Sequence, residues 1–148
     1  MAFRFPLATV LLFRQNLEHQ QELLFQESHQ RVERVRIEIE SVNFAVTRIA
    51  EREAQQIMSG LSAAELQFDL LCRSVLVKRR NKLEKDMAQA EQVIAVRREV
   101  LRLARQQREV LDTLKTQQLE IYLQQQTRQE QRSLDDLFLL RRAFLRRN

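Results

Sequence analysis

Apolar residues recur at steps of three and four along most of the chain. In the first part they form one seam, whose members are Val32, Val35, Ile39, Val42, Val46 and Ile49. The upstream residues expected to extend this seam are Val10, Phe13, Leu17 and Leu24. This spacing places apolar side chains along one side of a helix and is typical of coiled coils. It predicts one long helix over about residues 7–58.

The second part of the chain carries two such seams next to each other. The members of the first are Leu83, Met87, Ala90, Ile94, Leu101, Ala104 and Leu111. The members of the second are Val93, Val96, Val100, Leu103, Val110, Leu114 and Ile121. The same three-four spacing therefore predicts another coiled-coil helix, over about residues 63–145, which is the longer of the two.

Residues that break helices are almost absent from this sequence. The 148 residues include one Gly and one Pro. Pro6 suits the first turn of a helix, Gly60 suits a helix C-cap, and Ser62-Ala63-Ala64-Glu65 is a capping box that begins a new helix. A short turn at 59–62 between two long helices makes them antiparallel neighbours. We therefore predict an all-α fold: a single coiled-coil domain over 1–148, with two long helices in an antiparallel hairpin.

The difference in helix length predicts an unpaired end. From about Gln117 onward the second helix is expected to have no intramolecular partner, whereas Phe3 and Phe5 are expected to lie alongside it before that point. The apolar residues on the unpaired end are Leu134, Leu137, Phe138, Leu139 and Leu140. Such a cluster is costly to leave in water, so it indicates a docking surface.

Charge is distributed unevenly and limits the classes of partner. Residues 1–60 carry 7 Lys and Arg against 8 Asp and Glu, whereas residues 61–148 carry 18 against 12. The cluster Lys78-Arg79-Arg80-Asn81-Lys82 resembles a nucleic-acid patch, but Glu84 and Asp86 neutralise it at helical spacing. The chain also has one Tyr and no Trp on which bases stack. The preferred interpretation of these basic clusters is a solvated helix face; an acidic protein face, and less so nucleic acid or an anionic membrane surface, are the candidate partners.

The residues favour a protein that is not an enzyme. His19 and His29 lie on different faces of the predicted helix, and Cys72 has no His near it in sequence. No second metal ligand pairs with either His at helical spacing, and one Gly excludes a phosphate-binding loop, so neither a metal site nor a cofactor site is expected. A single Cys, with no signal peptide and no apolar run long enough to span a membrane, predicts a cytoplasmic protein.

Two stretches resemble one known family. The start, Phe3-Arg4-Phe5-Pro6-Leu7-Ala8-Thr9-Val10-Leu11, is similar to the F-x-F-x-L-x-x-V-L start of the flagellar export protein FliJ family. The distal stretch resembles the family's L-x-x-L-K/R … Y … E-Q-x-x-L-D-E-L pattern through Leu111–Lys115, Tyr122 and Gln129–Leu137. Asp136 stands where the family pattern usually has Glu, which is a conservative departure. The resemblance covers essentially the whole chain.

The resemblance implies a function as well as a fold. FliJ-like proteins are antiparallel two-helix coiled coils of the flagellar type III export apparatus, similar to the central stalk of rotary ATP synthases. Such a protein inserts into the hexameric ring of the export ATPase FliI and promotes its assembly. It also contacts the membrane export gate protein FlhA and helps recycle export chaperones. The family has no catalytic residues and no cofactor, and it is located in the cytoplasm, peripheral at the inner face of the cell membrane.

The resemblance also implies two contact regions. The gate contact corresponds to apolar residues near the turn, here Phe68, Leu71 and Val75, together with Phe44. The ATPase contact corresponds to the end that carries both termini, here Phe3, Phe5, Leu134, Leu137 and Phe138. The alternatives are the stalk protein of a virulence type III system, a basic coiled coil that binds nucleic acid or membrane, and a purely structural scaffold.

Overall fold

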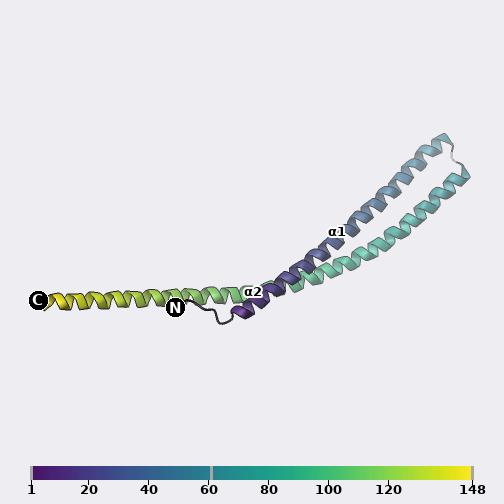
Figure 1. Ribbon diagram of the computed structural model, residues 1–148. Coiled ribbons are helices and arrows are strands. Elements are labelled where there is room, and N and C mark those ends of the chain that lie inside the picture. Colours follow the sequence, from purple (N-terminus) through teal and green to yellow (C-terminus); the bar gives the residue numbers. More distant parts are fainter. Residues whose placement is uncertain (1, 61, 148) are drawn as a thin grey trace. The chain divides into compact units, whose positions relative to one another are not determined.

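The protein folds into two helices joined by a short turn. The computed structural model describes residues 2–60 and 62–147. Helix α1 spans Ala8–Ser59 and helix α2 spans Ala63–Arg146 (Figure 1), and no strand occurs in these two ranges. The predicted all-α hairpin with a longer second helix is confirmed, and each predicted helix boundary agrees to within one residue.

The residues around the turn end one helix and begin the next, as their chemistry predicts. Gly60 has a φ of 88°, a left-handed conformation that side chains with a Cβ rarely adopt. The backbone N–H of Ser62 donates to Glu65 Oε2 at 3.3 Å, and the backbone N–H of Glu65 donates to Ser62 Oγ at 3.3 Å. This reciprocal pair is the predicted capping box. Leu61, within the predicted turn, lies outside the described residues.

Contacts group the described residues into two compact units. Unit 1 combines the start of the chain, up to Glu18, with the part of α2 from Leu103 onward, and unit 2 is His19–Arg102. Each unit has its own core. The prediction of a single domain over the whole chain stays a prediction.

In unit 2 the two helices run antiparallel around the predicted seam. The interhelical ion pairs are Arg52–Asp69, Glu53–Arg73 and Glu38–Arg79, so positions nearer the N-terminus on α1 meet positions farther along α2. The most buried apolar side chains are Val42, Leu83, Ala90 and Leu101. Three of these four belong to the first predicted seam of α2, which is therefore confirmed as the face that packs against α1.

In unit 1 the start of the chain packs on α2. Arg14 Nη1 donates to Gln107 Oε1 at 2.6 Å, and the Phe3 and Tyr122 rings lie 5.5 Å apart between centroids. The most buried apolar side chains of the unit are Phe5, Leu11 and Ala104. The N-terminal segment before Pro6 is thus part of the packed structure of this unit.

The upstream seam predicted for α1 is wrong in part. Val10 and Phe13 are 42% and 61% exposed, whereas Leu11 between them is 5% exposed. Leu17 and Leu24 of the predicted seam are half-buried. A continuous series of buried and half-buried positions nevertheless runs through polar residues at alternating steps of three and four, and its members are Leu11, Arg14, Glu18, Gln21, Phe25, Ser28, Val32 and Val35. Apolar residues alone do not reveal this register, because four of its eight positions are polar.

The unpaired end of α2 begins later than predicted. Pairing continues past Gln117 to Tyr122, where the Phe3 ring makes its contact. Residues 2–5 are not helical. A non-helical segment extends farther per residue than the 1.5 Å rise of a helix, so the N-terminal residues reach farther along α2 than a helix would.

Candidate functional site

The paired part of unit 1 is held together by an arginine that bridges two carboxylates. Arg108 of α2 donates through Nε to Glu18 of α1 and through Nη1 to Asp112 Oδ2, the latter at 2.6 Å. Arg105 Nε also lies 3.6 Å from Glu18 Oε1. The hydrogen bond to Asp112, followed by the one to Glu18, raises the pKa of the Arg108 guanidinium above its ordinary value. This cluster joins the two helices and is structural, since its polar groups are occupied with one another.

A second polar link lies near the turn, in unit 2. The Asp69 side chain is almost fully buried and accepts a hydrogen bond from Arg52 Nη2 across the hairpin. One position away on α1, Glu53 Oε2 accepts from Arg73 Nη2 at 2.6 Å. The two links carry opposite polarity, with the cation on α1 in the first and on α2 in the second. This arrangement satisfies a buried carboxylate at the end of the hairpin.

The residues predicted to contact the export gate are exposed near the turn. Phe68, Leu71 and Val75 are 62%, 67% and 64% exposed. Their steps of three and four place them on one face of α2. Phe44 of α1 is also exposed, and the Arg48 guanidinium lies 5.9 Å from the centre of its ring. Their role in binding stays a prediction.

The residues predicted to contact the ATPase divide into two groups. Leu134, Leu137 and Phe138 on α2 are all more than 60% exposed. Phe3 is partly covered by its contact with Tyr122, and Phe5 is 5% exposed. Phe5 therefore packs in the interior of unit 1, and an exchange of Phe5 would alter that packing as well as any contact with a partner.

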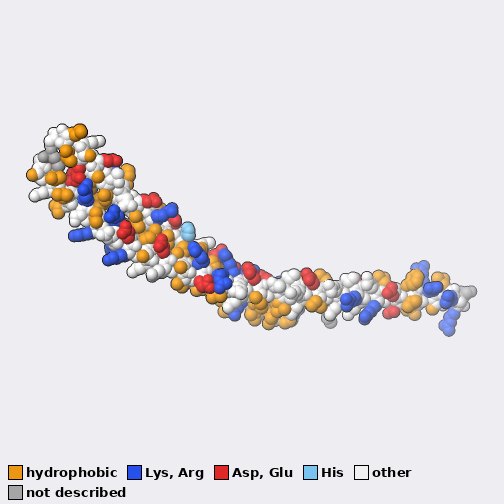
Figure 2. Space-filling view, turned by 180° about the vertical axis from the view of Figure 1, so that it is seen from behind, with side chains coloured by type: hydrophobic (Ala, Val, Ile, Leu, Met, Phe, Trp, Pro, Cys, Tyr) orange, Lys and Arg blue, Asp and Glu red, His pale blue; other side chains and the backbone are white. Residues whose placement is uncertain are grey.

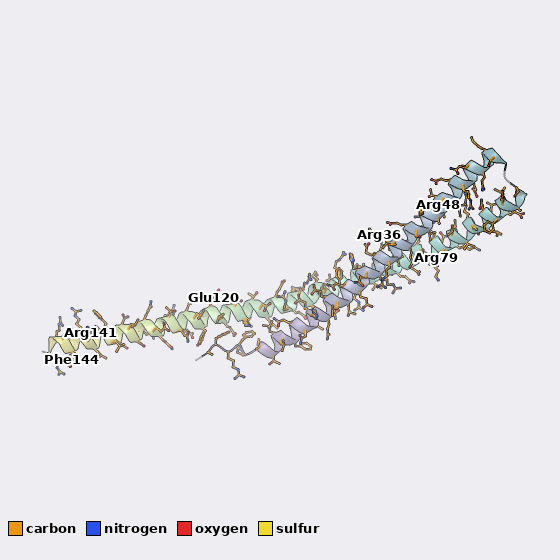
Figure 3. The ribbon with its side chains drawn as sticks, turned by 45° about the horizontal axis from the view of Figure 1, so that its top comes forward. Arg36, Arg48, Arg79, Glu120, Arg141 and Phe144 are labelled. Atoms are coloured by element: carbon orange, nitrogen blue, oxygen red, sulfur yellow. The ribbon has the colours of Figure 1, made fainter. Side chains whose placement is uncertain are left out.

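Every described side chain of α2 beyond Gln126 is exposed to solvent. Two of them, Arg141 and Phe144, project from the helix with no neighbouring element (Figure 3). Hydrophobic and basic side chains alternate on the surface of this segment (Figure 2). We call residues 127–147 the bare end of α2. An uncovered apolar surface of this kind, on a helix anchored at its other end, is suited to binding a macromolecule.

Comparison with known families identifies the chain. The model of the family described as "Flagellar FliJ protein" matches residues 3–148, which include both the start motif and the distal motif. The chain belongs to the FliJ family. This FliJ-family chain is thus a coiled-coil protein related to flagellar type III export, from a family of structural and adaptor proteins. No curated protein and no solved structure matches it.

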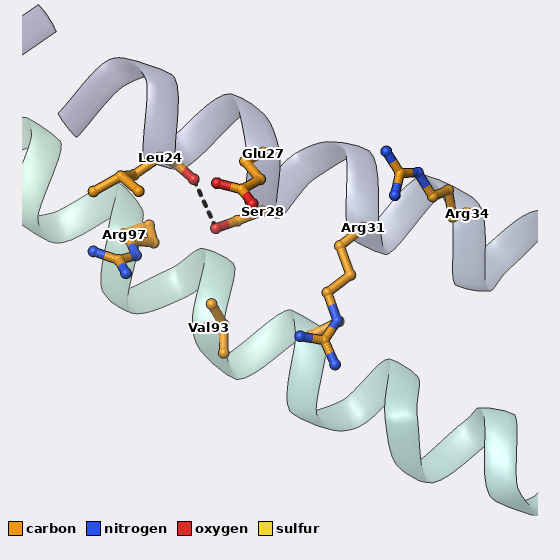
Figure 4. A pocket seen from close by; sticks show the side chains of 8 residues that line it. Leu24, Glu27, Ser28, Arg31, Arg34, Val93 and Arg97 are labelled. Carbon is orange, nitrogen blue, oxygen red and sulfur yellow. Dashed lines mark hydrogen bonds between the residues drawn. The ribbon is translucent and has the colours of Figure 1, made fainter. Parts of the chain in front are cut away.

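Sequence reasoning missed one feature of this FliJ-family chain, a groove between the helices of unit 2. Its volume is about 290 Å³, and the residues around it include Leu24, Ser28, Arg31, Val93 and Arg97 (Figure 4). Ser28 of α1 and Ala90 of α2 both line the groove and are buried, and their small side chains leave space between the helices. Ser28 Oγ donates to the Leu24 carbonyl at 2.9 Å, which satisfies the buried hydroxyl. The signal in the sequence was the run of two four-residue steps after Leu24, where the apolar seam is interrupted.

The other side chains that the sequence offered as candidates for chemistry in this FliJ-family chain are the two histidines and the cysteine. Within residues 2–60 and 62–147, no three His, Cys, Asp or Glu side chains gather in a way that could hold a metal ion. His19 and His29 are exposed, and Cys72 is a half-buried free thiol. None of the described helices contains a stretch apolar and long enough to cross a membrane.

Proposed function

We propose that this FliJ-family protein is a non-enzymatic stalk and adaptor of the flagellar export apparatus. In this proposal it binds the hexameric ring of the export ATPase FliI and promotes assembly of that ring. It also contacts the export gate protein FlhA and helps recycle export chaperones. Its place is the cytoplasm, peripheral at the inner face of the cell membrane through these partners.

The observation that carries this proposal is the bare end of α2. Leu134, Leu137 and Phe138 stand at steps of three and four on one side of a helix that no other described part of the chain covers. Burying three such side chains against a partner recovers about 25 cal/mol for each Å² of apolar surface removed from water. In the proposal, the stiff helical rod enters the central opening of the hexameric ring.

The face near the turn supports the second part of the proposal. Phe68, Leu71 and Val75 form an exposed apolar stripe in unit 2, and none of them belongs to the seam that packs against α1. Exposed apolar side chains that lie next to one another on a surface mark a site of protein interaction. This stripe is therefore the proposed contact with FlhA, with Phe44 of α1 as a further member.

The proposal is tested with purified export ATPase and a paired set of variants. Leu134→Asp combined with Leu137→Asp should abolish both co-purification with the ATPase and the rise in its ATP turnover. The matched control is Ile37→Asp, since Ile37 is 60% exposed and lies outside both predicted contact regions. Circular dichroism checks that the variants keep their helical content.

Three results would contradict the proposal. The wild-type protein would leave ATP turnover unchanged, or the paired variant would stimulate the ATPase as strongly as the wild type does. Salt-dependent binding to DNA, with no effect on the ATPase, would favour a nucleic-acid-binding coiled coil instead.

A further inference from the structure

The last residues of α2 combine exposed apolar side chains with an excess of positive charge. The bare end of α2 contains six Arg and three Asp or Glu, and its final stretch, residues 139–147, contains four Arg and no acidic residue. No ion pair joins these arginines to a carboxylate within the described residues. The arginines of this segment are therefore available to a ligand, unlike Arg108 in the paired part of unit 1.

Most of the two kinds of side chain lie on different parts of the helix surface; the exceptions are Leu139, which falls on the side of the arginines, and Arg141, which falls on the apolar side. Leu137, Leu140 and Phe144 follow one another at steps of three and four, and Leu134, Phe138 and Leu145 lie next to them at steps of four and seven. At 100° per residue these six side chains fall within an arc of about 160°. Arg128, Arg132, Arg142 and Arg146 fall outside that arc. All six apolar side chains are 60% to 70% exposed.

This arrangement distinguishes between classes of ligand. A second copy of the chain would bring two arginine-rich ends together, and like charges repel at that distance. A nucleic acid would neutralise the arginines but would leave Leu140 and Phe144 in water. An anionic lipid surface can bind both the apolar and the basic side chains. The apolar face packs against the acyl chains, and the arginines contact the headgroups.

We propose that the bare end of α2 binds directly to an anionic membrane surface, lying in the interface with Leu137, Leu140 and Phe144 towards the acyl chains. Arg142 and Arg146 contact the lipid phosphates. Arg141 lies within the apolar arc and extends its long side chain outward to the headgroups. This is contact with lipid without a protein partner, and it goes beyond the proposed function.

The test is co-sedimentation of the full-length protein with lipid vesicles. One set contains equal parts of phosphatidylglycerol and phosphatidylcholine, and the other contains phosphatidylcholine alone. The wild-type protein should bind the first set and not the second, and added salt should weaken the binding because it screens the charges. Leu140→Ser with Phe144→Ser should reduce binding about tenfold, and Arg142→Gln with Arg146→Gln should have an effect of similar size.

Matched controls separate this surface from general effects of charge and hydrophobicity. Arg34→Gln with Arg98→Gln removes the same charge from exposed positions of unit 2, and Ile37→Ser with Ile57→Ser removes exposed apolar side chains there. Both control pairs should bind vesicles as the wild type does. Any of three results would overturn the proposal. A control pair could lose as much vesicle binding as the pairs on the bare end, or the pairs on the bare end could bind vesicles as the wild type does. The wild-type protein could also bind both vesicle sets equally. Binding to DNA that outcompetes the vesicles would assign the arginines to nucleic acid instead.

The same variants keep this inference separate from the proposed function. The four residues exchanged on the bare end lie outside the proposed ATPase contact; they are Leu140, Arg142, Phe144 and Arg146. The residues assigned to that contact are Phe3, Phe5, Leu134, Leu137 and Phe138. Loss of vesicle binding with normal ATPase stimulation supports membrane binding alone. Normal vesicle binding with no ATPase stimulation overturns the proposed stalk and leaves membrane binding intact.

Discussion

The start of unit 1 and the bare end of α2 use the same kinds of residue with opposite results. Leu11 is 5% exposed and Leu137 is 63% exposed, although both belong to three-four patterns on long helices. Arg108 is bonded to two carboxylates, whereas Arg128 and Arg132 make no ion pair in the described chain. The difference is the presence of a second segment alongside the helix. Residue type alone therefore does not separate core from docking surface in this protein.

The largest expected effect comes from making the same Leu→Ala substitution in the packed part of unit 1 and on the bare end of α2. Leu11→Ala should lower the free energy of unfolding by about 2–4 kcal/mol, because it leaves a cavity in a packed seam. Leu137→Ala should change it by less than about 0.5 kcal/mol, because its side chain is already in water. Urea denaturation followed by circular dichroism measures both.

A smaller difference in the free energy of unfolding is expected when a carboxylate is removed from each of the two regions. Glu18→Ala removes the interhelical partner of Arg108, and we expect a loss of about 1 kcal/mol in the free energy of unfolding. Glu130→Ala, on the bare end, should be neutral to within about 0.3 kcal/mol. Repeating the urea titrations in high salt should shrink the Glu18 effect, since part of it is charge attraction. Equal effects of the two exchanges would show that the interhelical cluster contributes nothing.

The smallest effect concerns an ion pair within α2 itself. The hydrogen bond from Arg102 lowers the pKa of the Glu99 carboxyl, against a smaller opposing effect of burial. A lowered pKa in the folded state means that the contribution to stability is present above the ordinary Glu pKa and is lost as the pH falls through the lowered value. Arg102→Gln should raise the pKa of Glu99 towards its ordinary value in an NMR titration. An unchanged pKa would show that the pair does not persist in solution.

Much of the fold follows from local chemistry that the sequence displays. Gly60, Ser62 and Glu65 are close neighbours, and their backbone requirements predict the turn without knowledge of distant residues. The first seam of α2 is equally clear, because most of its members are strongly apolar. Pairing across the hairpin is harder to predict from the sequence. The register near Leu11 runs through polar residues, and only the partner helix shows which side chains become buried.

The candidate surfaces were predictable to a lesser degree. Leu134, Leu137 and Phe138 were expected at the surface because the second helix is longer than the first, and they are exposed. Phe5 was expected to serve a partner, yet its ring is buried, since the segment before Pro6 packs on α2. The groove at Ser28 and Ala90 depends on two small residues that are distant in sequence. Pattern analysis of one helix at a time does not bring them together.

The alternating seam of α1 limits how the length of this protein can change during evolution. Removing or adding a single residue rotates everything beyond it by about 100° and moves buried positions to the surface. A change of seven residues restores the seam almost completely. The parts of α1 and α2 that pack against each other should therefore gain or lose length in matched blocks of seven residues, one block on each side of Gly60. The bare end of α2 has no opposing segment, so insertions and deletions of other lengths should accumulate there.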